Sequence, residues 1–410
     1  MNASVLFISY DGLLDPLGGS QILPYLRSIR HQPRPLYILS FEKQARLKLG
    51  EKSLRTSLDS EGINWTPLTF TTNCGKAGKL WDLSRMYTTA LYLHSKNRFD
   101  IIHCRSYQAM QVGDFLTKLT GVKTIFDMRG LWVNERVDGG IWKLDQRLDR
   151  SIFRAYKRIE RKLLANSSHI IALTERVVPE LYKLSPDISA PISIIPCCAD
   201  FKHFKLLSPQ EHALTRTKLG LPKNAFVLSY LGSLGTWYML EDMFKFFAQA
   251  ASQRDDIHFL LITKDWKDEN EKLVKALGLS HLRKHIHIHP AQREQVPAYI
   301  GCSDIMLSFI KPAYSKMASS PTKMAEALAV GVPVISNSGI GDVDILTQSL
   351  NAGAVVDLSD ENSIIETVSS LNSIKDLGGN ALRERAKPVL DLNVAETSYY
   401  NIYKQLEDKI

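Results

Sequence analysis

Short apolar runs rich in β-branched residues alternate with longer segments of helical periodicity along most of the chain. In the first half we expect strands at Val5–Ser9, Leu36–Ser40, Ile101–Cys104, Thr124–Asp127, His169–Thr174 and Ile192–Pro196. The pattern then restarts, with strands expected at Phe226–Leu231, Ile257–Ile262, His285–His289, Ile305–Ser308 and Val332–Ser336. Near-continuous apolar strands separated by helices are typical of a parallel sheet that is covered on both faces. The sequence therefore predicts two successive doubly wound α/β units.

The length agrees with this division, because 410 residues suit two domains. The boundary is expected near Pro196, where a strand ends and a polar linker begins, so that the first domain covers residues 1–198. The last segment, Val394–Leu406, is predicted to be a helix with no following strand. In folds of this class, ligands bind beyond the carboxyl ends of the strands.

The net charge of +8 is unevenly distributed. Residues 1–198 carry a balance of +10, whereas residues 199–410 carry −2. A basic half suggests an anionic contact such as a membrane surface, a phosphorylated acceptor or nucleic acid, with a solvated basic surface as the alternative. Residues 147–164 form a basic amphipathic helix whose apolar side is explained by packing on its own sheet, and a membrane role for its basic face stays open.

Five cysteines without CxxC spacing indicate neither a disulfide framework nor a zinc knuckle. A reducing cytoplasm fits this pattern best. The N-terminus lacks the basic region of a signal peptide, and no stretch reaches about 18 uninterrupted apolar residues. We therefore expect a soluble or peripheral cytoplasmic protein.

Charged residues follow two consecutive strands of the first unit. His103 and Arg105 end one strand, and Asp127 and Arg129 end the next. Charges at the ends of buried strands are costly unless they pair or bind a ligand. These residues are thus predicted to line a polar cleft, with a structural ion pair between Asp127 and either arginine as the alternative.

One glycine-containing loop follows the first strand of each unit. Gly18 and Gly19 are expected to open a helix whose backbone N–H groups a ligand could approach, although a tight turn that needs glycine is an equal alternative. The spacing is not G-x-G-x-x-G, which argues against a dinucleotide site. Gly232 and Ser233 offer a similar backbone in the second unit.

The segment from Ser319 to Ser336 carries the clearest local signal. Ser320 as N-cap, Pro321 at the first helical position and Gly331 beyond the last turn predict a short helix. Lys323 then lies at the positive end of the helix dipole, where an acid is preferred. A bound anion would resolve this conflict, held by Lys323, the Thr322 hydroxyl and free N–H groups.

Glu326 lies on the same helix face as Lys323 and could accept hydrogen bonds from sugar hydroxyls. The alternative is a solvent-exposed Lys323–Glu326 pair. Lys264 and Lys311 each follow a strand of the second unit, but lysines in such positions are more often surface residues.

These residues together resemble the retaining GT-B glycosyltransferases, in particular glycosyltransferase family 4. The resemblance spans essentially the whole chain. Its motifs are Gly18-Gly19, Asp127-Met-Arg129-Gly130 with Glu135, Ile195-Pro196…Asp200…Phe204, Tyr230-Leu-Gly232-Ser233, and Pro321-Thr322-Lys323…Glu326-Ala-Leu-Ala-Val-Gly331-Val-Pro333. It implies two Rossmann-like domains facing across a cleft, with the C-terminal helix (390–410) crossing back to the acceptor-binding N-terminal domain. Residues 199–389 would then form the nucleotide-sugar donor domain.

Two departures from the family pattern concern the donor. Ala318 stands where members carry the first of two glutamates, the one that usually contacts the transferred sugar. The stretch from Ser233 to Met239 has no cation where members place an arginine and a lysine. Lys323, assisted by Lys264 or Lys311, is expected to supply the charge for the diphosphate instead.

The resemblance implies a retaining, metal-independent hexosyltransferase that needs no cofactor beyond its nucleotide-diphosphate sugar. Its acceptor would be a glycan or a lipid-linked molecule, as in surface polysaccharide or glycolipid biosynthesis, reached by peripheral association with the inner face of the cytoplasmic membrane. The residues assigned to catalysis are Asp127, Arg129, Lys323 and Glu326. The residues assigned to the donor are Gly18, Gly19, Gly232, Ser233, Lys264, Lys311, Ser320, Thr322, Lys323 and Glu326. The residues assigned to the acceptor are His103, Arg105, Asp127, Arg129 and Glu135.

Two other classes are alternatives. A sugar-nucleotide 2-epimerase, acting for example on a UDP-sugar, shares this architecture and would consume its substrate without an acceptor. A non-enzymatic nucleic-acid-binding protein would use the basic first half, but no helix-turn-helix, aromatic RNA-binding strand or zinc pattern supports it.

Overall fold

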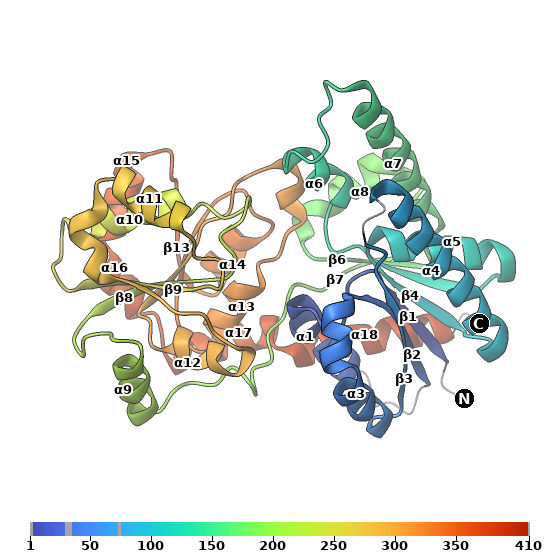
Figure 1. Cartoon of the computed structure of the whole chain (residues 1–410), viewed down its shortest axis with the longest axis horizontal. Coiled ribbons are helices and arrows are strands. Elements are labelled where there is room, and N and C mark those ends of the chain that lie inside the picture. Colours follow the sequence, from blue (N-terminus) through green and yellow to red (C-terminus); the bar gives the residue numbers. More distant parts are fainter. Residues whose placement is uncertain (1–2, 29–34, 73–74, 409–410) are drawn as a thin grey trace. The chain divides into compact units, whose positions relative to one another are not determined.

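The computed structural model describes residues 3–28, 35–72 and 75–408, which form two compact units (Figure 1). The first unit comprises Met1–Pro196 together with Leu392–Ile410, and the second comprises Cys197–Asp391. Cys74 lies outside the described residues. None of the helices formed by the described residues is long and apolar enough to cross a bilayer.

A seven-stranded parallel sheet forms the centre of the first unit, in the order β3-β2-β1-β4-β5-β6-β7. Its strands are β1 Val5–Ser9, β2 Leu36–Glu42, β3 Ile63–Thr69, β4 Ile101–Arg105, β5 Lys123–Asp127, β6 His169–Ala172 and β7 Ile192–Ile194. Its helices are α1 Pro16–Gln21, α2 Leu23–Ser28, α3 Gln44–Ser60, α4 Gly75–Asn97, α5 Ser106–Thr120, α6 Trp132–Asp138, α7 Arg147–Asn166, α8 Val178–Leu184 and α18 Leu392–Glu407, with the 3₁₀ turn η2 Glu175–Val177.

A six-stranded parallel sheet forms the centre of the second unit, in the order β10-β9-β8-β11-β12-β13. Its strands are β8 Phe226–Leu231, β9 Ile257–Ile262, β10 Ile286–Ile288, β11 Ile305–Ser308, β12 Val334–Asn337 and β13 Gly353–Val356. Its helices are α9 Pro209–Lys218, α10 Leu240–Ala251, α11 Asp268–Ala276, α12 Val296–Gly301, α13 Thr322–Ala329, α14 Val343–Ser349, α15 Glu361–Ser369, α16 Leu371–Lys375 and α17 Asn380–Leu390. The 3₁₀ helices are η3 Leu279–His285, η4 Arg293–Gln295 and η5 Tyr314–Ala318. The prediction of two doubly wound parallel α/β units is confirmed.

The C-terminal helix α18 packs on the first unit, where it contacts α2 and places Tyr399 against Tyr25 with ring centroids 5.9 Å apart. Figure 1 shows α18 in red among the blue elements of that unit. Its buried side chains recur at helical spacing, at Ala395, Tyr399, Ile402, Tyr403 and Leu406. The chain therefore ends in the unit in which it begins, as the predicted fold class requires.

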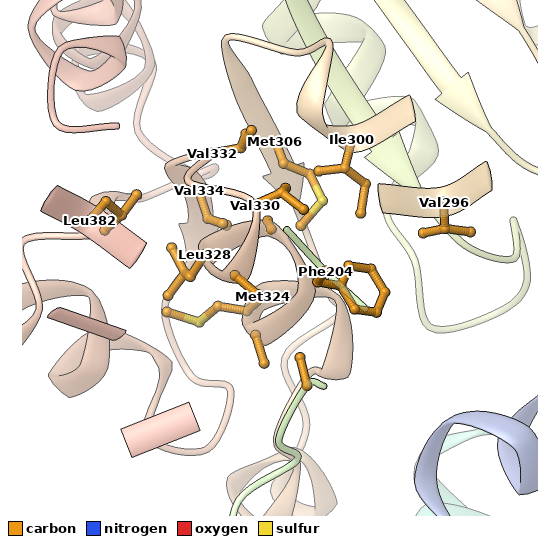
Figure 2. Packing of buried hydrophobic residues seen from close by; sticks show 14 of the residues in the cluster. Phe204, Val296, Ile300, Met306, Met324, Leu328, Val330, Val332, Val334 and Leu382 are labelled. Carbon is orange, nitrogen blue, oxygen red and sulfur yellow. The ribbon is translucent and has the colours of Figure 1, made fainter. Parts of the chain in front are cut away.

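The interior of the second unit fixes the orientation of α13. Met324 and Leu328, four residues apart, project from one side of this helix into a cluster with Phe204 and Val334 (Figure 2). Burial of such side chains is worth about 2 kcal/mol each. Because this apolar side is anchored, the positions of Lys323 and Glu326 on the same helix are set by the packing of the core.

Candidate functional site

A buried group of charges lies at the carboxyl ends of β4 and β5. The parallel register places Arg105 beside Asp127. Asp127 is fully buried, and its carboxylate oxygens lie 3.5 Å from Arg105 Nη1, 3.6 Å from Arg129 Nη1 and 3.7 Å from His103 Nε2. The structure thus brings together four of the five residues predicted to bind the acceptor.

The electrostatics of this group keep Asp127 ionised. Burial alone would raise the pKa of the Asp127 carboxyl, but Arg129, His103 and Arg105 together lower it to about 2. Burial lowers the pKa of His103, so its ring is neutral near pH 7. The structural ion pair that the sequence left as an alternative is therefore present, with two guanidinium groups around one carboxylate.

Arg129 differs from its neighbours in backbone and exposure. Its φ of +56° lies in the left-handed region, which non-glycine residues seldom adopt. Its Nη2 donates to Gln21 Oε1 at 3.2 Å, and its side chain is 10% exposed against 4% for Arg105. Strained backbone of this kind clusters at functional sites. Arg129 is the member of the group best placed to meet a ligand.

Two tyrosines of α18 complete the group, and the sequence analysis did not identify them. Tyr399 Oη donates to Asp127 Oδ2 at 3.4 Å, and Tyr403 Oη lies 2.7 Å from His103 Nδ1. The two pairs are separated by 272 and 300 residues along the chain, so no local pattern signals either contact. The C-terminal helix therefore supports the charged cluster directly.

Glu135 lies on α6, the short helix that follows the Asp127–Gly130 segment, and it is half-buried. Burial and the charge of Glu160 raise the pKa of Tyr107, and the charge of Glu135 adds to this shift. The Tyr107 hydroxyl donates to Glu160 Oε1 at 2.6 Å. Glu135 therefore lies within electrostatic range of the Tyr107–Glu160 pair.

Lys323 is the most unusual charged group of the second unit. It is only 8% exposed, and its Nζ donates to Tyr230 Oη at 3.1 Å. The same Nζ lies 4.2 Å from the ring centroid of Tyr230 and 3.7 Å from that of Tyr238. No acidic side chain of the described residues pairs with Lys323 within 4.0 Å. The alternative of a solvent-exposed Lys323–Glu326 pair is thus wrong.

Burial without an adjacent carboxylate lowers the pKa of Lys323 to about 7, although the charge of Glu326 opposes this shift. The amine also lies close to the backbone of Gly232, where a Cβ would come within 3.1 Å of Nζ. Gly232 has a φ of +131°, a conformation that favours glycine. The loop after β8 therefore leaves room for the Lys323 amine.

Glu326 is 4% exposed and forms an ion pair with Arg293 of η4. Burial raises the pKa of the Glu326 carboxyl, while Arg293 and Lys323 oppose the shift. Arg293 itself is about one-third exposed and lies 4.8 Å from the ring centroid of Phe204. The sequence analysis did not identify Arg293, which lies 33 residues before its partner.

The start of α13 differs from the predicted helix start. The helix begins at Thr322, its N-cap is Pro321, and no side chain caps it. Ser320, predicted as the N-cap, instead accepts a hydrogen bond from the Cys197 N–H at 3.0 Å. Its hydroxyl is engaged with the start of the second unit and is not directed to the first turn of the helix. The N-terminus of α13 therefore keeps uncapped backbone N–H groups beside Lys323.

The loop after β1 also differs from the prediction, which placed Gly18 and Gly19 at the start of a helix. The helix α1 begins at Pro16, so Gly18 and Gly19 lie within it and do not open it, and the Gly19 N–H donates to Asp15 O at 3.0 Å. A Cβ at Gly18 would lie 2.2 Å from Gly12 O, so close packing accounts for this glycine. The buried carboxylate of Glu42, which sequence analysis missed, fixes the same loop by accepting from the Leu13 N–H at 2.7 Å.

The remaining predicted donor residues lie around the same end of the second sheet. Ser233 accepts a hydrogen bond from Tyr230 Oη through its carbonyl, at 2.5 Å. Lys264 and Lys311 are exposed, and Lys264 Nζ donates to Gln292 Oε1 at 3.2 Å. A third lysine, Lys316 of η5, is buried, with Nζ 3.8 Å from the ring centroid of Trp237. Of the three lysines assigned to the donor from sequence, Lys323 is thus buried, as is Lys316, whereas Lys264 and Lys311 are exposed.

The fold is that of known GT-B enzymes. Sucrose-phosphate synthase from Thermosynechococcus elongatus superposes with a TM-score of 0.72 at 14% identity over 100% of both chains. Anabaena HepE in complex with UDP-glucose gives 0.69 at 14% identity over 98% of this chain and 100% of that one. A glycosyltransferase from Rickettsia africae gives 0.68 at 16% identity, over 99% and 98%. No curated protein sequence is significantly similar to this chain.

Family models assign the chain more specifically. Residues 212–387 match the glycosyl transferases group 1 family, and residues 51–198 match the glycosyl transferase 4-like domain. The two matches take in most of both units. The protein is thus of the GT-B class, with two Rossmann-like domains. It belongs to the group 1 glycosyltransferases.

Replacing Asp127 by Asn should leave two buried guanidinium groups without their carboxylate and lower the free energy of unfolding by about 3 kcal/mol at pH 7. Because the pKa of Asp127 is depressed to about 2, its stabilising contribution exists above pH 3.8 and is lost as the pH falls toward 2. The difference between wild type and D127N should therefore shrink over that range. Urea unfolding at a series of pH values measures it.

The matched control is Asp187→Asn, because Asp187 pairs with Arg161 at 2.9 Å on an exposed surface. It should change stability by less than about 1 kcal/mol. Equal losses for the two variants at pH 7 would show that the Asp127 cluster does not stabilise the first unit.

Proposed function

We propose that the protein transfers a sugar from a nucleotide-diphosphate donor bound by the second unit. The observation that carries this proposal is the buried Lys323 amine, which has no acidic partner among the described residues and lies beside the uncapped start of α13. A helix N-terminus and an adjacent lysine together suit a phosphate. Structures of HepE that hold UDP or UDP-glucose show such ligands on a protein of the same fold.

The chemistry follows from where charge develops. As the bond between sugar and diphosphate breaks, negative charge accumulates on the leaving phosphate, and a fixed cation stabilises this state more than the ground state. Lys323, the Thr322 hydroxyl and the first N–H groups of α13 supply that stabilisation. Glu326, held by Arg293, accepts hydrogen bonds from the ribose hydroxyls of the donor.

The acceptor is bound by the first unit, with Arg129 holding an anionic group such as a phosphate through paired N–H donors. A glycan or lipid-linked acceptor carrying a phosphate satisfies this requirement. The basic first unit then faces an anionic membrane surface through α7, whose exposed cations include Arg154, Arg158 and Lys162. The enzyme works at the inner face of the cytoplasmic membrane as a peripheral protein.

Transfer proceeds with retention of anomeric configuration and without a metal. The chain contains one Asp-x-Asp segment, Asp342–Asp344, at the start of α14. Across residues 3–28, 35–72 and 75–408, no three His, Cys, Asp or Glu side chains are arranged to hold a metal ion. In this proposal Lys323 provides the positive charge, and the leaving phosphate oxygen takes the proton of the acceptor hydroxyl.

The donor site is tested by thermal shift with a panel of UDP-, GDP-, ADP- and dTDP-sugars. At least one should stabilise the wild type, and Lys323→Ala should weaken its binding by roughly ten- to hundredfold, the worth of a charged hydrogen bond. Lys218→Ala is the control, because this exposed lysine of α9 lies over the ring of Tyr299 and makes no contact with Tyr230 or Tyr238 in the described interactions. Wild-type affinity in K323A would contradict the phosphate role.

Once donor and acceptor are paired, the NMR coupling constants of the first-formed product should report the same anomeric configuration as the donor. Activity should persist at full rate in excess EDTA. Inversion at the anomeric carbon, or loss of turnover that added Mg²⁺ restores, would refute the corresponding part of the proposal.

Membrane association is tested by co-sedimentation with vesicles of phosphatidylcholine containing about one-third anionic lipid. Each cation near such a surface contributes about 1 kcal/mol, so the triple variant R154A/R158A/K162A should bind roughly a hundredfold more weakly. A triple variant of exposed second-unit lysines, K272A/K275A/K284A, is the control. Binding that ignores the anionic lipid, or equal losses in both variants, would exclude α7 as the contact.

A further inference from the structure

The aromatic pair that surrounds Lys323 comes from the strand and loop that lack the cations of the family pattern. Tyr230 lies in β8, and Tyr238 lies just before α10. Their ring centroids are 5.9 Å apart, and the two ring planes are inclined at 62° to each other. The Lys323 amine lies within cation–π distance of both rings. The second unit therefore holds a lysine from α13 against this loop.

The hydrogen bonds fix the direction of this contact. Tyr230 Oη donates its proton to the Ser233 carbonyl, so it can only accept from Lys323 Nζ. Tyr238 is fixed through its backbone, because its N–H donates to Gly235 O at 3.0 Å and it forms a bridge with Ile310. Both rings are thus set by the fold, and the amine is placed between them.

An aromatic cage holds a cation without neutralising it. A carboxylate in the same place would cancel the charge of Lys323, whereas the faces of two rings only partly stabilise it. Lys323 as a whole is 8% exposed, and its amine lies beside Gly232. The negative charge that would form an ion pair with the Lys323 amine then comes from a bound anion.

We propose that Tyr230 and Tyr238 are positioning residues, which hold the Lys323 amine without an acidic partner so that the donor diphosphate supplies the opposing charge. This inference rests on the proposed donor site and goes beyond it, because it assigns the loop after β8 a role that does not need a cation of its own. The same arrangement predicts that the Lys323 amine takes up a proton when the donor binds.

The proton follows from the pKa of Lys323, which burial lowers to about 7 in the free protein. An adjacent diphosphate favours the charged amine and raises this pKa, so binding takes up a proton above pH 7 and almost none below it. Among the described residues, the charge that acts on the amine is Glu326, which is paired with Arg293, and Asp265 acts on Tyr230. Lys316 lies over Trp237, the residue before Tyr238. Burial raises the pKa of Tyr230 well above its usual value, so that hydroxyl does not titrate.

The experiment is calorimetric titration with the nucleotide sugar that gives the largest shift in the panel. Both of its phosphates are esterified, so the ligand does not titrate near neutral pH. Heats measured in two buffers of different ionisation enthalpy give the number of protons taken up. We expect about one proton per site at pH 8 and close to none at pH 6 for the wild type.

Tyr238→Leu removes one ring and opens the amine to water. Its nucleotide-sugar affinity should fall roughly three- to tenfold at pH 6. Its proton uptake at pH 8 should drop toward zero, because a hydrated lysine is already charged there. Tyr238→Phe, which keeps the aromatic ring, should retain most of the wild-type nucleotide-sugar affinity and most of the proton uptake at pH 8. Tyr299→Leu, which removes a buried ring under Lys218, controls for loss of packing.

The outcomes separate the two proposals. Weak binding by K323A, together with wild-type affinity and proton uptake in Y238L, would overturn the positioning role and leave the donor site intact. Absence of proton uptake by the wild type at pH 8 would also overturn it. Wild-type binding by K323A would instead overturn the donor site itself. An equal decrease of proton uptake in Y299L and Y238L would overturn the positioning role, because it would show that the decrease comes from a general loss of packing.

Discussion

A parallel sheet brings the carboxyl ends of all its strands to one edge, and both units of this protein place their costly charges there. In the first unit the register of β4 and β5 sets Arg105 beside Asp127. In the second, the loop after β8 and the start of α13 bring Gly232 and Lys323 together. The chemistry of the enzyme depends on this one topological constraint, because it converges side chains that are far apart in sequence.

The two charged groups solve the problem of burial differently. Asp127 is surrounded by donors from β4, from the segment after β5 and from α18. It stays ionised because Arg129, His103 and Arg105 lower its pKa to about 2. Lys323 is surrounded by aromatic rings, and its pKa falls to about 7. A buried carboxylate with hydrogen-bond donors around it contributes to the free energy of unfolding. A buried amine without an acidic partner lowers that free energy, and a bound anion can offset the loss. This contrast is why the donor proposal rests on the second unit.

Much of the fold could be predicted from the sequence, and the errors have physical causes. All eleven expected strands overlap observed ones, but β3 and β13 were missed because each is a half-buried edge strand without a continuous apolar run. Lys323 was recognisable because a cation in a first helical turn conflicts with the helix dipole. Its cage was not, since Tyr230 and Tyr238 lie more than 80 residues away. Ser320 matched the N-cap pattern, yet a tertiary contact with Cys197 takes its hydroxyl.

The central claim is that the Lys323 amine meets the diphosphate of a nucleotide sugar. A crystal structure of the protein with the nucleotide sugar selected by thermal shift tests it most directly. The account predicts a phosphate oxygen within hydrogen-bond distance of Lys323 Nζ, with the amine still between the rings of Tyr230 and Tyr238. The account would be contradicted by a bound nucleotide whose phosphates contact other cations, while Lys323 Nζ donates only to Tyr230 Oη.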